Sequence, residues 1–215
     1  MMAGTIGMDA LADWLVRFRD AVTAKRDWLT ELDSAIGDAD HGANMTRGME
    51  AVVAKLDPAP ATVDELLKTA GMTLVGSVGG ASGPLYGTFF LRMGMTAGAV
   101  TELDAPGLAA ALRAGLEGIV ARGKAEAGDK TLFDAMAPAV DALDARIGEG
   151  ADLADAARAA AEAAAEGRDA TLPLVARKGR ASYLGERSAG HLDPGAASTV
   201  LLFETLADAV AGRTR

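Results

Sequence analysis

The sequence predicts an all-α protein of about eight antiparallel helices. Near the start, Leu11, Trp14, Leu15, Phe18 and Val22 recur at helical spacing with charges between them, which gives one apolar stripe. The segment 152–167 is almost entirely alanine and charged residues, and alanine is the strongest helix former. No run of alternating β-branched residues indicates a strand. With no linker or repeat, residues 1–215 are expected to form one domain.

Caps and helix breakers divide the chain. The first helix is expected to begin after Asp9 as N-cap and to run to about residue 32. Thr62 with Glu65 forms a capping-box pattern, and Asp193-Pro194 combines an N-cap with proline at the first helical position. The remaining helices are expected at about 42–55, 62–74, 84–93, 105–123, 130–147, 152–167 and 194–206.

Composition excludes several classes of protein. The formal net charge of −9 argues against a nucleic-acid partner, since nucleic-acid binding needs a basic surface. The chain has no cysteine, which excludes thiolate metal sites and cysteine nucleophiles. Residues 1–10 lack the pattern of a signal peptide, and no apolar run reaches the ~18 residues of a membrane span. A cytoplasmic location without a membrane partner is the expectation.

Four polar or glycine-rich segments interrupt the helical pattern, at 33–44, 76–84, 123–131 and 177–195. Each lies at a predicted helix boundary. Alternate boundaries of an antiparallel bundle lie at the same end, so these segments are expected to meet there and form a site.

The first segment holds three aspartates, Asp33, Asp38 and Asp40. Mg²⁺ prefers oxygen ligands and is commonly bound by a few carboxylates together with substrate phosphates. An EF-hand counted from Asp38 fails, because its fifth and twelfth positions are Gly42 and Met49. Spacing alone leaves a metal site and a solvated acidic turn both open; the adjacent hydrogen-bonding side chains of His41 and Asn44 favour a site.

The other segments are compatible with phosphate. "GGASGP" at 79–84 offers unhindered backbone amides before a helix, although it also suits a tight helix crossing. "RKGRASYLGERS" at 177–188 concentrates basic residues in an acidic protein, although it also suits a solvated loop. "GDKT" at 128–131 lacks the rest of a P-loop pattern, which excludes a P-loop NTPase.

Four motifs, "ELDSAIGDADHGANM", "GGASGPLYGT", "RGKAEAGDKT" and "RKGRASYLGERSAGHLDPGA", resemble in order those of the nucleotide-binding L subunit of dihydroxyacetone kinases. The resemblance implies a barrel of eight antiparallel helices that binds ADP or ATP and two Mg²⁺ ions at one end. It implies that Asp33, Asp38 and Asp40 hold the metal. The residues that it assigns to the nucleotide are His41, Gly42, Ala43, Asn44, Ala81, Ser82, Gly83, Gly123, Leu132, Arg180, Asp193, Pro194 and Gly195. Arg177 is the alternative to Arg180.

The resemblance also implies the partners. A separate K subunit holds dihydroxyacetone, and in one version of the kinase a phosphohistidine M subunit recharges the bound ADP; in the other version free ATP exchanges. No residue of the L subunit needs to act as a nucleophile or general base, since phosphoryl transfer depends on positioning and charge neutralisation. Whether the chain forms a homodimer is left open at this point. The alternatives are a non-catalytic nucleotide-binding regulator and the L subunit of a kinase for another ketose or sugar alcohol.

Overall fold

The computed structural model describes residues 4–212, so both ends of the predicted 1–215 domain lie outside the described residues. The described part is mainly helical, which confirms the predicted fold class. Its elements in chain order are β1 (Thr5–Gly7), α1 (Met8–Ala24), α2 (Arg26–Ile36), α3 (His41–Ala54), α4 (Val63–Ser77), α5 (Ser82–Ala97), β2 (Glu102–Asp104), α6 (Ala105–Gly123), α7 (Phe133–Gly148), α8 (Leu153–Ala170), the 3-10 helix η1 (Arg180–Ser188) and α9 (Pro194–Val210).

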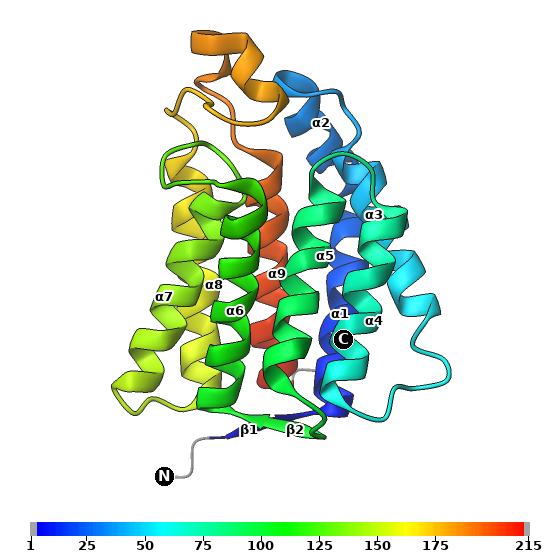
Figure 1. Cartoon of the computed structure of the whole chain (residues 1–215). Coiled ribbons are helices and arrows are strands. Elements are labelled where there is room, and N and C mark those ends of the chain that lie inside the picture. The colour runs from blue at the N-terminus through cyan, green and yellow to red at the C-terminus, as the bar shows by residue number, and fades with distance from the viewer. Residues whose placement is uncertain (1–3, 213–215) are drawn as a thin grey trace.

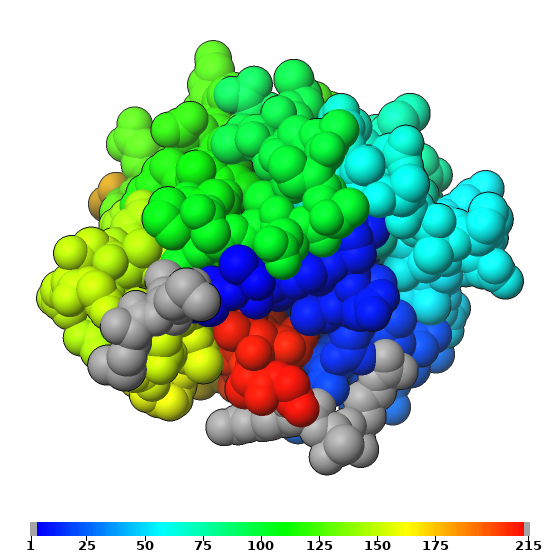
Figure 2. All heavy atoms as spheres, turned by 90° about the horizontal axis from the view of Figure 1, so that it is seen from below, coloured from blue at the N-terminus to red at the C-terminus, as the bar shows by residue number. Residues whose placement is uncertain are grey.

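The long helices form an antiparallel bundle in which sequence neighbours pack side by side (Figure 1). Contacts run from α3 through α8 in chain order, and α9 packs against α1, α7 and α8. Figure 2, which views the molecule from below, shows the C-terminal end of α9 between α1 and α8. Among the described helices, none is both long and apolar enough to cross a membrane.

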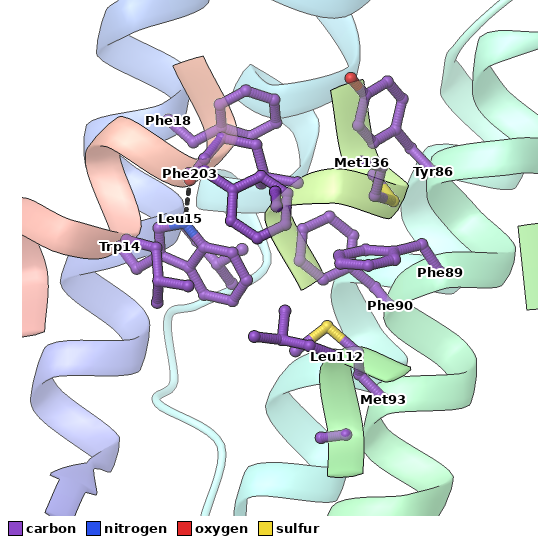
Figure 3. Close-up of a cluster of buried hydrophobic side chains, with 14 of the residues drawn as sticks. Trp14, Leu15, Phe18, Tyr86, Phe89, Phe90, Met93, Leu112, Met136 and Phe203 are labelled. Atoms are coloured by element: carbon purple, nitrogen blue, oxygen red, sulfur yellow. Dashed lines mark hydrogen bonds between the residues drawn. The ribbon is translucent and has the colours of Figure 1, made fainter. Parts of the chain in front are cut away.

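The core is built around a cluster of aromatic rings at mid-height in the bundle (Figure 3). Trp14 and Phe90 lie with ring centroids 5.6 Å apart, and Phe89 meets Phe90 edge-on at 5.2 Å. The indole N–H of Trp14 donates to the carbonyl of Leu202 at 2.9 Å, so this buried polar atom is satisfied and α1 is tied to α9.

Glycines allow α4 and α5 to approach closely. A Cβ placed on Gly71 of α4 would lie 2.7 Å from the carbonyl oxygen of Gly87 and 2.8 Å from the amide nitrogen of Leu91, both in α5. Backbone atoms cannot yield as a flexible side chain can. These glycines therefore set the distance between α4 and α5, the two helices that the turn 78–81 connects.

The helix boundaries differ from the predictions at the N-terminal end. The single helix predicted to residue 32 is two, because Lys25 adopts φ −102° and ψ 12° within the exposed stretch 23–27. The N-cap is Gly7, and Asp9 lies in the first turn instead. The prediction of no strand is wrong: β1 and β2 pair antiparallel, with Ile6 opposite Leu103. Three-residue strands are too short to show alternation.

Other boundaries depend on local hydrogen bonds. The predicted N-cap Asp193 is confirmed, since its carboxylate accepts from the amide of Ala196 at 2.7 Å. Thr62 is the N-cap of α4 but its side chain makes no capping hydrogen bond, and Glu65 accepts from the amide of Ala61 instead. Helix α5 begins two residues before the predicted Pro84, at Ser82.

The close approach of α4 and α5 predicts opposite effects for one substitution at two positions of α4. Gly71→Ala should lower the free energy of unfolding by about 1–3 kcal/mol because its methyl group meets backbone. Gly76→Ala should raise it by up to about 0.5 kcal/mol, since nothing lies within 4 Å and alanine favours helix. Urea unfolding of both variants measures the difference; equal effects would contradict the steric account.

Candidate functional site

A cavity of about 440 Å³ lies at the end of the bundle where η1 and the end of α2 meet (Figure 1). Its lining residues come from all four of the segments predicted to gather, together with the ends of α5 and α6. That prediction of topology is confirmed. It follows from the alternating helix directions, which bring the junctions 37–40, 78–81, 124–132 and 171–193 to the same end.

The first turns of four helices open into this cavity. The N-cap residues of α3, α5, α7 and α9 are Asp40, Ala81, Leu132 and Asp193, and all of them line it. The first amides of a helix lack partners within the helix, and its N-terminus carries partial positive charge. Four converging N-termini therefore make the cavity favourable for an anion.

The carboxylate of Asp33, in the last turn of α2, is hydrogen-bonded to the backbone at the start of α3. Its Oδ2 accepts from the amides of Asp40 at 2.8 Å and His41 at 3.1 Å, and the side chain is 8% exposed. A Cβ on Gly37 would lie 2.0 Å from Oδ1 of Asp33, so only glycine leaves room for this carboxylate. The absence of a side chain at Gly37 is therefore what allows the Asp33 carboxylate to occupy this position.

Asp38 and Asp40 belong to the tight turn between α2 and α3. Ala39 between them has φ 60°, which is uncommon for a residue other than glycine. Arg180, the first residue of η1, approaches Oδ2 of Asp38 at 3.1 Å. The only long cationic side chain paired with these three carboxylates among the described residues thus comes from a segment about 140 positions away in the sequence.

The three carboxylates fit a hard divalent cation. One oxygen from each of Asp33, Asp38 and Asp40 can be chosen so that all lie within 4.8 Å of one another. Oδ2 of Asp33 already holds two amides, and its Oδ1 lies over Gly37. A set made only of oxygen donors, one of them buried, suits Mg²⁺.

A hydrogen-bond network of hydroxyls around His41 links the start of α3 to the start of α5 and to α9. His41 is buried, with Nδ1 3.2 Å from the Ser82 hydroxyl and Nε2 2.9 Å from that of Ser198. Ser198 continues to Tyr86 at 2.8 Å and Tyr86 to Thr199 at 3.0 Å. This network fixes the imidazole between α3, α5 and α9.

Burial keeps this network uncharged. It lowers the pKa of His41 to about 4, against the opposing attraction of Asp33 and Asp40. It also raises the pKa of Tyr86 to about 12, even though hydrogen bonds from Ser198 and Thr199 act in the other direction. At neutral pH both groups are therefore neutral hydrogen-bonding partners.

The lining of the cavity also includes apolar and basic side chains. Leu85, Ile119 and Leu132 line it together with Gly123, and Arg122 and Lys178 are lining residues as well. A cavity that combines apolar side chains with carboxylates and helix N-termini suits a ligand that carries both an apolar group and anionic groups.

Asp193 is the most perturbed carboxyl of the site. Burial raises its pKa to about 7, with Asp134 and Asp33 adding to the rise and the Ala196 amide and Lys130 opposing it. Its backbone amide donates to the hydroxyl of Thr171 at 3.0 Å. Asp193 is thus held at the start of α9 through both its backbone amide and its carboxylate.

Most of the residues assigned to the site by sequence line the cavity. Those that do are Asp33, Asp38, Asp40, His41, Asn44, Ala81, Ser82, Gly123, Leu132, Arg180, Asp193, Pro194 and Gly195. Gly42, Ala43 and Gly83 do not. A Cβ on Gly42 would lie 2.1 Å from the carbonyl of Arg26, and one on Gly83 would lie 2.2 Å from that of Val78, so both glycines serve close packing. Arg177, the alternative to Arg180, is not a lining residue.

Sequence reasoning missed several lining residues. Ile36, Leu85 and Ile119 read as ordinary helix positions, and nothing in the pattern indicates that they face a cavity. The partners of His41 in the hydroxyl network, Ser198, Tyr86 and Thr199, do not line the cavity, and the sequence pattern does not indicate them either. Lys130 was dismissed together with the partial P-loop pattern, although a lysine beside two glycine-rich segments was a usable signal.

Known proteins resemble the chain over most of its length. A family model described as "DAK2 domain" matches residues 35–208. The PEP-dependent dihydroxyacetone kinase, ADP-binding subunit DhaL, of Escherichia coli K12 is 46% identical over 201 residues, which cover 92% of this chain and 94% of that subunit. The corresponding subunit DhaL of kinase 1 of Listeria innocua is 49% identical, covering 94% and 96%.

A solved structure is similar in fold. The dihydroxyacetone kinase from C. freundii in complex with AMP-PNP and Mg²⁺ matches with a TM-score of 0.70 at 26% identity, over 92% of this chain. The present chain spans about a third (33%) of that kinase chain.

The raised pKa of Asp193 predicts a pH-dependent stability in the chain without metal or nucleotide. Between about pH 4 and 7 the unfolded chain releases this proton while the folded chain keeps it, so stability falls as pH rises, and above about pH 7 the loss is complete. Asp193→Asn keeps a capping acceptor and removes the charge. Its stability relative to the native chain should therefore rise from pH 4 to 7, by up to about 4 kcal/mol.

Denaturant unfolding at a series of pH values measures this difference. Asp152→Asn, the same exchange at the exposed N-cap of α8, separates the loss of a capping charge from the effect of burial. A difference between Asp193→Asn and the native chain that stays constant from pH 4 to 8 would contradict the assignment.

Proposed function

The chain belongs to the DAK2 domain family, and from this premise we propose that it is the ADP-binding subunit of a PEP-dependent dihydroxyacetone kinase. The observation that carries the proposal is the placement of three aspartates within 4.8 Å of one another in a cavity that four helix N-termini enter. Residues 1–215 then act as one nucleotide-binding domain, since segments from most of the chain contribute to one cavity.

The nucleotide is proposed to lie across the cavity. Its phosphates sit at the start of α5, where Ala81 and Ser82 offer amides, and near the first turn of α3. Asn44 and Arg180 contact the nucleotide from two sides. The base lies on the wall of Leu85, Ile119 and Leu132, beside Gly123.

Asp33, Asp38 and Asp40 are proposed to hold two Mg²⁺ ions. When bound, the ions supply positive charge that neutralises the phosphates and orients them for transfer. The carboxylates provide the oxygen ligands, and the amides of Asp40 and His41 hold Asp33 in a fixed position. His41, held between two serine hydroxyls, keeps the acidic turn and the start of α5 together.

The sugar is proposed to be dihydroxyacetone, held on a separate K subunit. A phosphohistidine M subunit restores the phosphoryl group on bound ADP, in line with the PEP-dependent relatives. This chain excludes water from the phosphates and positions them, and it needs no nucleophile of its own. The cavity lies at one end of the bundle, where a docked partner can reach it.

Removal of one metal-binding carboxylate should strongly weaken Mg²⁺-dependent nucleotide binding. Asp38→Asn or Asp40→Asn should weaken ADP binding in Mg²⁺ by roughly a hundredfold, about 2.7 kcal/mol, because each removes a charged ligand. The helical fold should stay intact, and the metal-free variant should be slightly more stable because repulsion is relieved. Isothermal titration calorimetry measures the affinity.

Asp27→Asn is the matched control, since this exposed residue of α2 lies outside the cavity, and its affinity for ADP should equal that of the native chain. Unchanged ADP affinity in Asp38→Asn and Asp40→Asn would contradict the metal assignment.

The purified chain alone should not phosphorylate dihydroxyacetone, because the sugar site belongs to another subunit. Turnover should appear when a K subunit, an M subunit and the phosphoenolpyruvate system are added, and ATP with the K subunit alone should not replace them. ADP retained through purification is expected. A coupled assay of dihydroxyacetone phosphate measures each mixture, and robust turnover by the chain alone would refute the two-subunit account.

A further inference from the structure

Lys130 is a buried cation without a carboxylate partner. It is 1% exposed, and among the described residues no carboxylate oxygen lies within 4.0 Å of its Nζ. Its ammonium donates instead to the backbone carbonyls of Thr171 at 2.8 Å, Leu174 at 3.0 Å and His191 at 2.5 Å. These are all of the donors that an ammonium group has, so none is left for a ligand.

The three carbonyls lie at both ends of one excursion of the chain. Between α8 and α9 the chain leaves the bundle after Thr171, forms η1 and returns at His191. The amide of Gly190 donates to the carbonyl of Leu172 at 2.8 Å, which closes the base of the excursion from within. Lys130 lies in the junction between α6 and α7, so its hydrogen bonds connect this junction to the base of the excursion. A second link is the amide of Arg177, which donates to the carbonyl of Asp129 in the same junction at 3.1 Å.

The excursion forms one wall of the cavity. Residues 178–181 line it, and Arg180 reaches Asp38 at 3.1 Å. Apart from the ion pair of Arg180 with Asp38 and the packing of η1 against α2, the tip is open: the Arg180 side chain is 67% exposed and Gly185 interrupts η1 with φ 56°. Bonds at the base therefore contribute to the position of Arg180.

We propose that Lys130 is a positioning residue that clamps the base of the 171–191 excursion and thereby holds Arg180 over the nucleotide. The inference rests on the proposed function for the role of Arg180, and on the structure alone for the clamp. Loss of the ammonium leaves the carbonyls of Leu174 and His191 without their donor, and the carbonyl of Thr171 keeps only the amide of Leu174, at 3.2 Å. Buried carbonyls without partners favour opening of the segment to water.

The clamp is tested by hydrogen exchange on the chain without nucleotide. In Lys130→Met, amides of residues 172–192 should exchange about tenfold faster than in the native chain, while those of α1, α5 and α9 keep their rates. Lys124→Met is the matched control, because this exposed lysine belongs to the same junction and has a positive φ of 49°, as Lys130 has at 62°. Unchanged exchange in 172–192 overturns the clamp, whatever becomes of the proposed function.

The link to Arg180 is tested by a double-mutant cycle on ADP affinity in Mg²⁺. Lys130→Met should weaken binding about tenfold in the native background and less than about twofold in an Arg180→Ala background, because the two changes remove the same contact. Equal losses in both backgrounds overturn the positioning role. If Lys130→Met does not fold, Lys130→Gln, which keeps two N–H donors, should show the same pattern with smaller effects. Equal losses of affinity for Lys130→Gln in the native and Arg180→Ala backgrounds would likewise contradict the positioning role.

Discussion

The main energetic constraint on the site is the mutual repulsion of three carboxylates, whose oxygens lie within 4.8 Å of one another. Two unit charges about 5 Å apart repel by roughly 3 kcal/mol at the dielectric constant of about 20 that suits a protein surface. The chain's own compensation is smaller: an exposed pair such as Asp38 with Arg180 contributes at most about 1 kcal/mol, and a helix N-terminus about as much. The divalent cation proposed for this site would complete the balance. Gly37, the left-handed Ala39 and the amides given to Asp33 all serve to keep the carboxylates together.

The antiparallel bundle explains why one end is suited to phosphate. Because helix directions alternate, α3, α5, α7 and α9 all begin at the cavity and direct their positive ends toward it. The acidic turn lies among these N-termini, so the same field that attracts phosphate also lowers the cost of the carboxylates. Small residues at the helix starts, such as Ala81 and Gly195, keep the amides accessible. The excursion before α9 then brings Arg180 to Asp38.

Much of this could be predicted from sequence because it depends on local patterns. Apolar spacing and caps such as Asp193-Pro194 predicted the helices and, through their alternation, the gathering of four segments. The break at Lys25 was not predictable, since one exposed residue changes dihedral angles without disturbing the periodicity. The hydroxyl network from His41 to Tyr86 and the clamp of Lys130 join residues 40 to 160 positions apart. Only tertiary structure shows such pairings, and Gly42 and Gly83 show that proximity in a motif does not place a residue in the cavity.

The central claim is that the three aspartates bind the metal of a metal–nucleotide complex. Its most direct test is a crystal structure of the chain with ADP and Mn²⁺, in which anomalous scattering locates the metal independently of the protein phases. The account predicts anomalous peaks within coordination distance of carboxylate oxygens of Asp33, Asp38 and Asp40, with the ADP phosphates at the starts of α3 and α5. Ordered ADP in the cavity with no anomalous peak at these carboxylates would contradict it.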